Sequence, residues 1–256
     1  MMKARMLACT LLLLAPGAWA MEGDPLPEEI GHWDELSLAM LRHREWPFAA
    51  VVEMAKQRPG ALRAIRNLRG VKQPYRNQGN NDAYRHSELV TAAAASYQYR
   101  SWEAWRCAQL RAATHDVGKA LCTFIEHDAD GNEVVRAFGH GPRGASLAKE
   151  DLAEIGVEQE MSDEVAEGVF WHMLPHQLGK REGARAPTAD EYRELDGSFR
   201  YGLTMADLHL MGITDRRGCV PPDRDPTEPW PADTLFVQIE RFAQGARDAG
   251  VYEPPE

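Results

Sequence analysis

The strongest constraint on the fold is that apolar residues recur at helical spacing in segment after segment, with Pro, Gly and turn residues between the segments. His86, Val90, Ala93, Ala94 and Tyr97, for example, fall on one face of a long helix. This pattern predicts an all-α fold, a helical bundle formed by a single domain over residues 21–256, because no break in composition forces a domain boundary. Further helices are predicted over residues 33–56, 61–69, 102–115, 143–154, 163–173, 190–211 and 233–247.

Some segments break the helical pattern. The turn signal Asp128-Ala129-Asp130-Gly131 lies between the apolar pairs 124–125 and 134–135, and it predicts a short hairpin or an irregular loop near 124–136. Loops are also predicted over 73–82, over 175–187 and over 218–231, the last of which contains five prolines.

The first twenty residues have the three-part pattern of a secretory signal peptide. Lys3 and Arg5 precede an apolar run over 6–15, and Ala18-Trp19-Ala20 resembles a cleavage site. This interpretation predicts an exported protein, periplasmic or secreted. The alternative is that translation starts at Met21, which would leave the protein in the cytoplasm. The apolar run is too short for a permanent membrane helix, so we expect no membrane contact in the mature form.

Composition excludes several classes of protein. With 44% hydrophobic and 27% charged residues, the chain can form a real core and is not disordered. The formal net charge of −10 argues against binding of a nucleic acid duplex, because such proteins need positive charge. Cys107, Cys122 and Cys219 remain after the leader, and no C-x-x-C pair indicates a zinc or redox site. We therefore interpret Cys107 and Cys122 as small core residues on helices. No pattern in the sequence indicates an oligomeric state.

Candidate metal ligands recur along the chain at intervals of about one helix plus a connection. Successive helices of a bundle could therefore each aim one ligand at a common centre. Imidazole and carboxylate together suit a divalent transition metal better than calcium. The candidates are His86, His115, Asp116, His140, His172 and Asp207.

In this order, the residues resemble the H…HD…D signature of the HD superfamily of metal-dependent phosphohydrolases. The stretches HDVGK (115–119), DGNEVVRAFGHGPRGASLA (130–148) and VFWHMLP (169–175) resemble the HD domains of bacterial tRNA nucleotidyltransferases and polynucleotide end-healing enzymes. The similarity covers residues 73–211. The nucleotidyltransferase head and a Walker A motif are both missing, which favours a stand-alone phosphohydrolase domain.

The resemblance implies an all-helical fold around one or two divalent ions (Mn, Fe, Ni, Mg or Zn). It also implies hydrolysis of a small anionic phosphomonoester or phosphodiester, such as a nucleotide or a cyclic phosphate. His140 and His172 match the positions that hold a second metal, and Lys119 matches the lysine of the HD-x-G-K motif. The first metal's ligands correspond to His86, His115, Asp116 and Asp207.

For the mechanism, we expect water activated by the metal to attack phosphorus while Asp116 bridges and orients the reacting groups. Lys119 and Arg143 are expected to contact the phosphate. His176 competes with His172 as a ligand, and we favour His172 because it aligns with the H-M pair of the family. Two alternatives remain open: an HD-fold diiron oxygenase with the same ligand cage, and a metal-binding module without turnover.

Overall fold

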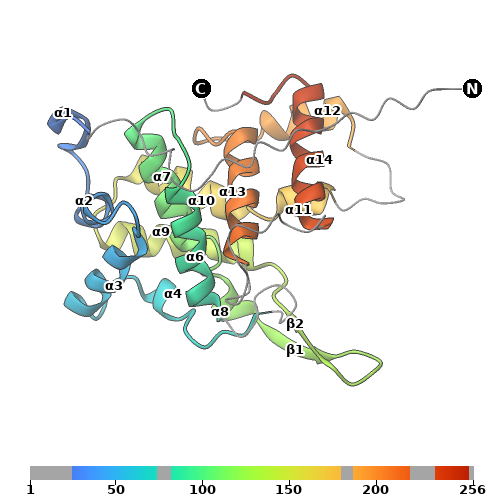
Figure 1. The fold of residues 1–256 in the computed structure, drawn as a ribbon, viewed down its shortest axis with the longest axis horizontal. Coiled ribbons are helices and arrows are strands. Elements are labelled where there is room, and N and C mark those ends of the chain that lie inside the picture. Colours follow the sequence, from blue (N-terminus) through green and yellow to red (C-terminus); the bar gives the residue numbers. More distant parts are fainter. Residues whose placement is uncertain (1–24, 74–81, 180–186, 220–233, 254–256) are drawn as a thin grey trace, which may run out of the picture.

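The structure, a computed structural model, describes residues 25–73, 82–179, 187–219 and 234–253, and this part of the chain is mostly helical (Figure 1). The predicted all-α class is therefore confirmed at the level of secondary structure. The helices are α1 (Pro27–Ile30), α2 (Glu35–Arg42), α3 (Phe48–Gln57), α4 (Arg63–Arg66), α6 (Ala83–Ala95), α7 (Trp102–Thr114), α8 (Lys119–Cys122), α9 (His140–Glu154), α10 (Gln159–Trp171), α11 (Leu174–Gly179), α12 (Ala189–Asp196), α13 (Met205–Gly218) and α14 (Thr234–Asp248).

Side-chain caps fix where the two central helices begin. The Asp82 carboxylate accepts a hydrogen bond from the Arg85 amide at 2.8 Å at the start of α6. The Ser101 hydroxyl accepts one from the Ala104 amide at 3.1 Å at the start of α7. Such caps satisfy amides that have no partner inside the helix. They place His86 in the first turn of α6 and leave His115 directly after α7.

Several predicted element boundaries differ from the structure: the helices predicted over 61–69, 143–154 and 163–173 are α4, α9 and α10, with the bounds given above. The helix predicted over 190–211 is two helices, α12 and α13, because the chain turns between them and Gly202 takes the left-handed conformation there (φ +88°). The predicted stretch 33–56 is interrupted between α2 and α3, where Pro47 precedes α3. The predicted loop 175–187 begins inside α11.

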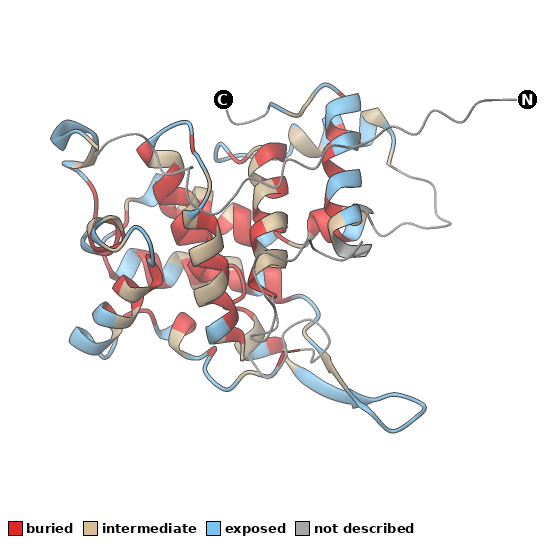
Figure 2. Cartoon of the chain, viewed as in Figure 1, coloured by how far each residue is buried: buried red, intermediate tan, exposed pale blue. Residues whose placement is uncertain are grey.

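The predicted hairpin is confirmed. β1 (Phe124–His127) and β2 (Glu133–Arg136) form an antiparallel pair with Ile125 opposite Val135. The hairpin projects away from the helices in Figure 1, and its residues are largely exposed in Figure 2.

Buried apolar residues form two main clusters, and Figure 2 shows that most buried residues lie on the helices. The larger one joins α2, α3 and α4 to α7, α9 and α10, with Leu110 and Leu152 fully buried. The second joins α11 and α12 to α13 and α14 around Leu208 and Phe242. α13, which belongs to the second cluster, also packs closely on α6.

Some predictions lie outside the described residues, namely the leader (1–20), most of the loop 73–82 and most of the proline-rich segment 218–231. Across the described ranges, no helix combines the length and the apolar character needed to cross a membrane.

Candidate metal centre

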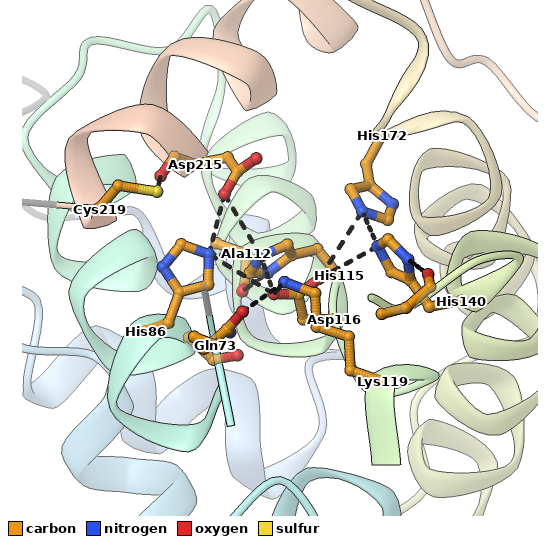
Figure 3. A network of polar contacts seen from close by, with 12 residues as sticks. Gln73, His86, Ala112, His115, Asp116, Lys119, His140, His172, Asp215 and Cys219 are labelled. Carbon is orange, nitrogen blue, oxygen red and sulfur yellow. Dashed lines mark hydrogen bonds and ion pairs between the residues drawn. The ribbon is translucent and has the colours of Figure 1, made fainter. Parts of the chain in front are cut away.

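A cluster of buried histidines and aspartates lies where α6, α7, α9, α10 and α13 come together (Figure 3). The side chains of four members are at most 2% exposed. Such a density of buried polar groups is costly unless a partner satisfies them. The members are His86, His115, Asp116, His140, His172 and Asp215.

Helix ends supply most of these side chains. His115 and His172 directly follow the last residues of α7 and α10, and His140 is the first residue of α9. His86 lies in the first turn of α6. The structure therefore brings together five of the six ligands predicted from the sequence, although His86 and His172 are far apart in the chain.

A backbone contact without side chains positions α9. A Cβ atom added to Gly118 would lie 2.0 Å from the carbonyl oxygen of His140 and 2.7 Å from the amide nitrogen of Gly144. A Cβ added to Gly141 would lie 2.8 Å from the carbonyl oxygen of Phe170. Only glycine permits these approaches. They hold the start of α9 against both the turn after Asp116 and the end of α10.

Three of the histidines have the same backbone anchor. In each, Nδ1 lies 2.6–2.8 Å from the carbonyl oxygen three residues earlier. A carbonyl only accepts hydrogen bonds, so Nδ1 carries the hydrogen and Nε2 of the neutral ring has a free lone pair. This is the arrangement that orients metal-ligating histidines. The pairs are His115 with Ala112, His140 with Ala137, and His172 with Val169.

The ring nitrogens that remain point at one another. Nε2 of His140 and Nε2 of His172 are 2.9 Å apart, and Nε2 of His86 and Nε2 of His115 are 3.2 Å apart. In the His140–His172 pair both atoms offer lone pairs, which repel unless a cation or a proton is shared between them. The chemistry of the donor set thus fits a metal ion.

Asp116 lies between these two histidine pairs. Its Oδ1 is 3.3 Å from Nε2 of His140 and 3.8 Å from Nε2 of His172. Its Oδ2 is 3.2 Å from Nε2 of His115 and 3.5 Å from Nε2 of His86. Buried groups of histidine and aspartate that could hold a metal ion therefore lie on both sides of one carboxylate.

The electrostatics of the cluster favour positive charge next to the carboxylates. Burial alone would raise the pKa of Asp116, but the charges of His115 and Lys119 outweigh it and hold that pKa well below the usual range. Burial also opposes charge on His115, yet Asp116 raises its pKa. The field that favours a proton on His115 also favours a metal cation there.

His172 behaves differently. Burial, together with the neighbouring His140 and His115, lowers the pKa of His172 to about 3. Its ring is therefore neutral at physiological pH, as a metal ligand must be.

The two predicted phosphate-binding cations lie in different surroundings. Lys119 is in the cluster: Nζ is 2.6 Å from Oδ2 of Asp116 and donates to Oε1 of Gln73 at 2.9 Å. Burial opposes its charge, but Asp116 raises the pKa of Lys119, so it stays protonated. Arg143 is exposed, and its guanidinium contacts Sγ of Cys122 at 3.6 Å. The structure therefore does not bring Arg143 into the cluster.

The prediction that Asp207 is a ligand is wrong in this structure. Asp207 forms a capping box with Thr204 at the start of α13: its Oδ2 accepts hydrogen bonds from the amide and the hydroxyl of Thr204 at 3.0 and 2.7 Å. Its Oδ1 lies 3.6 Å from the guanidinium of Arg111. The carboxylate thus has a local structural role at the helix N-terminus.

Asp215 takes the place expected for Asp207. It lies two turns further along α13, and its Oδ1 is 2.8 Å from Nε2 of His86 and 3.8 Å from Nε2 of His115. Nε2 of His176 lies 3.1 Å from the other oxygen of Asp215, Oδ2. His172 lies against Asp116 instead, so the two histidines contact different carboxylates. The sequence did contain a signal that Asp207 has a capping role, because Thr204-x-x-Asp207 matches the capping-box pattern that marks a helix start.

Comparison with known proteins adds no assignment: no model of a protein family matches the chain, and no curated protein sequence matches it significantly. The case for function therefore depends on the geometry of the cluster.

Proposed function

We propose that this protein is a metal-dependent phosphohydrolase of the HD type, with the fourth ligand of its first metal supplied by Asp215. The observation that carries the proposal is the single carboxylate of Asp116 between two histidine pairs whose Nε2 atoms face inward. Residues that would hold two divalent ions around one carboxylate fit phosphoryl transfer, because such ions would stabilise the charge on the attacking and leaving oxygens.

The ligands divide into two sets around Asp116. Its Oδ2 side has His86, His115 and Asp215, and its Oδ1 side has His140 and His172. Mixed imidazole and carboxylate donors suit Mn, Fe, Ni, Mg or Zn to different degrees, with imidazole favouring the transition metals. When bound, such an ion supplies Lewis-acid activation of water and of a phosphoryl oxygen at neutral pH.

The protein's own groups have separate tasks in this scheme. The carbonyl anchors hold the rings of His115, His140 and His172 in one tautomer, so no reorientation is needed when a cation is bound. Asp116 connects the two ligand sets, because Oδ2 faces His115 and Oδ1 faces His140. In this scheme the carboxylate thereby orients the groups that react between the two sets.

Lys119 is the cation best placed to bind the phosphate. Its side chain is 15% exposed, whereas that of Asp116 is only 2% exposed, so the ammonium lies between the buried carboxylate and solvent. Three N–H donors allow it to keep its contact with Asp116 and also donate to a phosphoryl oxygen. Arg143, which the sequence also indicated, can act only on an outer part of a substrate from its exposed position.

The test combines metal analysis with a substrate screen. The purified full-length chain is stripped with a chelator, reloaded with single divalent ions, and assayed on phosphomonoesters, phosphodiesters and cyclic phosphates with and without oxygen. We expect hydrolysis that depends on the metal and not on oxygen. Oxygen-dependent turnover would instead indicate the oxygenase alternative, and metal binding without turnover would indicate a binding module.

Two substitutions link the activity to the cluster. His115→Ala and Asp116→Ala should lose bound metal and activity while the helical circular dichroism spectrum is kept. Phe124→Ala, in the exposed hairpin, is the control and should retain both. Full activity after either cluster substitution would refute the assignment.

A further inference from the structure

We propose that Cys219 is an additional metal ligand that acts with His86 and Asp215, and that it makes this side of the cluster selective for zinc-like ions over Mg²⁺. The inference rests on the proposed function for the neighbouring metal centre and adds a sulfur ligand that neither the sequence patterns nor the ligand set above includes.

The geometry places three different donor types together. One ligand atom each from His86, Asp215 and Cys219 lies within 4.8 Å of the other two. Figure 3 shows Cys219 beside Asp215 and His86, on the side away from His140 and His172. Asp215 and Cys219 are four residues apart at the end of α13, so their side chains lie on one helix face. This is the spacing that lets a helix present two ligands to one ion.

His86 connects this group of donors to the rest of the cluster. The ring of His86 is fully buried, and its Nδ1 has no hydrogen-bond partner among the described residues. His86 belongs both to the group with Asp215 and Cys219 and to the group with His115 and Asp116. Nε2 of His86 lies 2.8 Å from Oδ1 of Asp215 and 3.2 Å from Nε2 of His115, so the imidazole is placed where the two sets of partners meet.

The fold gives Cys219 its position through a close helix contact. A Cβ atom added to Gly218 would lie 2.4 Å from Cγ2 of Val90 and 3.0 Å from the amide nitrogen of Val90. The end of α13 therefore lies directly on α6, one turn beyond His86. The adjacent thiol is buried and reaches the interior, and Sγ donates to the carbonyl oxygen of Asp215 at 3.4 Å.

Coordination would change the state of this thiol. Burial raises the pKa of the Cys219 thiol to about 12, so without a metal the group is an unreactive thiol. When the metal–sulfur bond forms, the S–H bond breaks and the proton leaves to solvent, because only the thiolate coordinates. No oxidation or reduction takes place. Thiolate favours zinc and similar ions, whereas Mg²⁺ prefers oxygen ligands.

The test uses Co²⁺ as a spectroscopic substitute for zinc. The metal-stripped full-length chain is titrated with Co²⁺, and the sulfur-to-metal charge-transfer band in the near ultraviolet is recorded alongside the visible bands that report binding. We expect the charge-transfer band in the native protein and in Cys107→Ser, and its loss in Cys219→Ser. Cys107 is the matched control because it is also buried, on α7, and contacts Glu164 and Arg111 rather than the cluster.

Affinity gives the second measurement. Competition with a coloured chelator should show that zinc affinity is lower by at least about 10- to 100-fold in Cys219→Ser, because loss of a group that only supports a metal ligand already costs this much. Mg²⁺ binding should be unchanged. Visible Co²⁺ bands without a charge-transfer band would overturn the role of Cys219 but leave the phosphohydrolase proposal standing. Failure to bind Co²⁺ at all, or a band that persists in Cys219→Ser, would also overturn it. Hydrolysis measured on the same samples tests the proposed function separately.

Discussion

Gly118→Ala should damage one side of the metal cluster without touching any ligand. The added methyl group would lie 2.0 Å from the carbonyl oxygen of His140, and such contacts essentially never fall below 3.0 Å. The start of α9 and the turn that carries Gly118 must therefore separate by at least 1.0 Å, the difference between these two distances. Because both contact partners are backbone, no side-chain rotation can relieve the clash.

This displacement is large on the scale of metal coordination. Metal–ligand distances are maintained to about 0.2 Å, so a shift of about 1 Å removes a ligand from bonding range. Whichever segment moves, the distance between Asp116, two residues before Gly118, and His140 changes. We expect Asp116, His140 and His172 to lose the ability to bind a metal ion together, and we expect a stability cost of about 1–3 kcal/mol for overpacking. The His86 side of the cluster should still bind metal.

The assay is metal content per chain by mass spectrometry after dialysis, with urea unfolding of the same samples. Gly60→Ala is the control, because a Cβ there meets only Oε1 of Glu154, at an ordinary distance of 3.7 Å. If Gly118→Ala kept the metal content and the unfolding free energy of the native protein, the argument from backbone contact would be refuted.

Three further predictions follow from the described contacts. Asp215→Asn should lower metal affinity by at least about tenfold, whereas Asp207→Asn should cost only about 1 kcal/mol of stability through the weakened cap; equal metal loss in both, measured by titration, would contradict the placement of these residues. Burial raises the pKa of Asp151 to about 6, although the amides of Ala64 and Ile65 donate hydrogen bonds to its carboxylate. The folded state therefore binds this proton more tightly than the unfolded state. As a result, the free energy of unfolding falls as the pH rises from about 4 to about 6. Asp151→Asn should remove that component, up to about 3 kcal/mol, and an unchanged difference between the two proteins in unfolding measured from pH 4 to pH 7 would exclude it. Removal of metal by a chelator should lower the free energy of unfolding by about 2.7 kcal/mol relative to metal at 100 times its Kd, and calorimetry showing no shift would argue against a resident ion.

The sequence was informative where local chemistry decides the structure. Ser101 marked the start of α7, and helical spacing found α6, so the positions of His86 and His115 at helix ends followed from short-range patterns. The turn signal at 128–131 likewise predicted the hairpin. These features depend on capping and turn preferences of neighbouring residues, which the sequence shows directly.

The sequence was less informative where distant contacts choose between similar residues. Asp207 and Asp215 both lie on α13. The capping-box pattern indicates that Asp207 begins this helix, but only the packing of α13 against α6 shows that Asp215 is the carboxylate that faces His86. Cys219 was not among the predicted ligands, because His86, one of its two neighbours in the cluster, is far away in the sequence. The close approach of Gly218 to Val90, which sets the register of these two helices, has no signature in either segment alone.

The anchoring of the ligands at the ends of separate helices has a consequence for how the chain unfolds. His86 and Asp215 are 129 residues apart along the chain, so an ion that they share would work as a reversible cross-link between distant segments. Fraying of a single terminus, such as the first turn of α9, would then open a path for exchange of the ion while the rest of the bundle stays folded. Hydrogen exchange at these termini would accordingly slow on loading, in proportion to how firmly the ion is held.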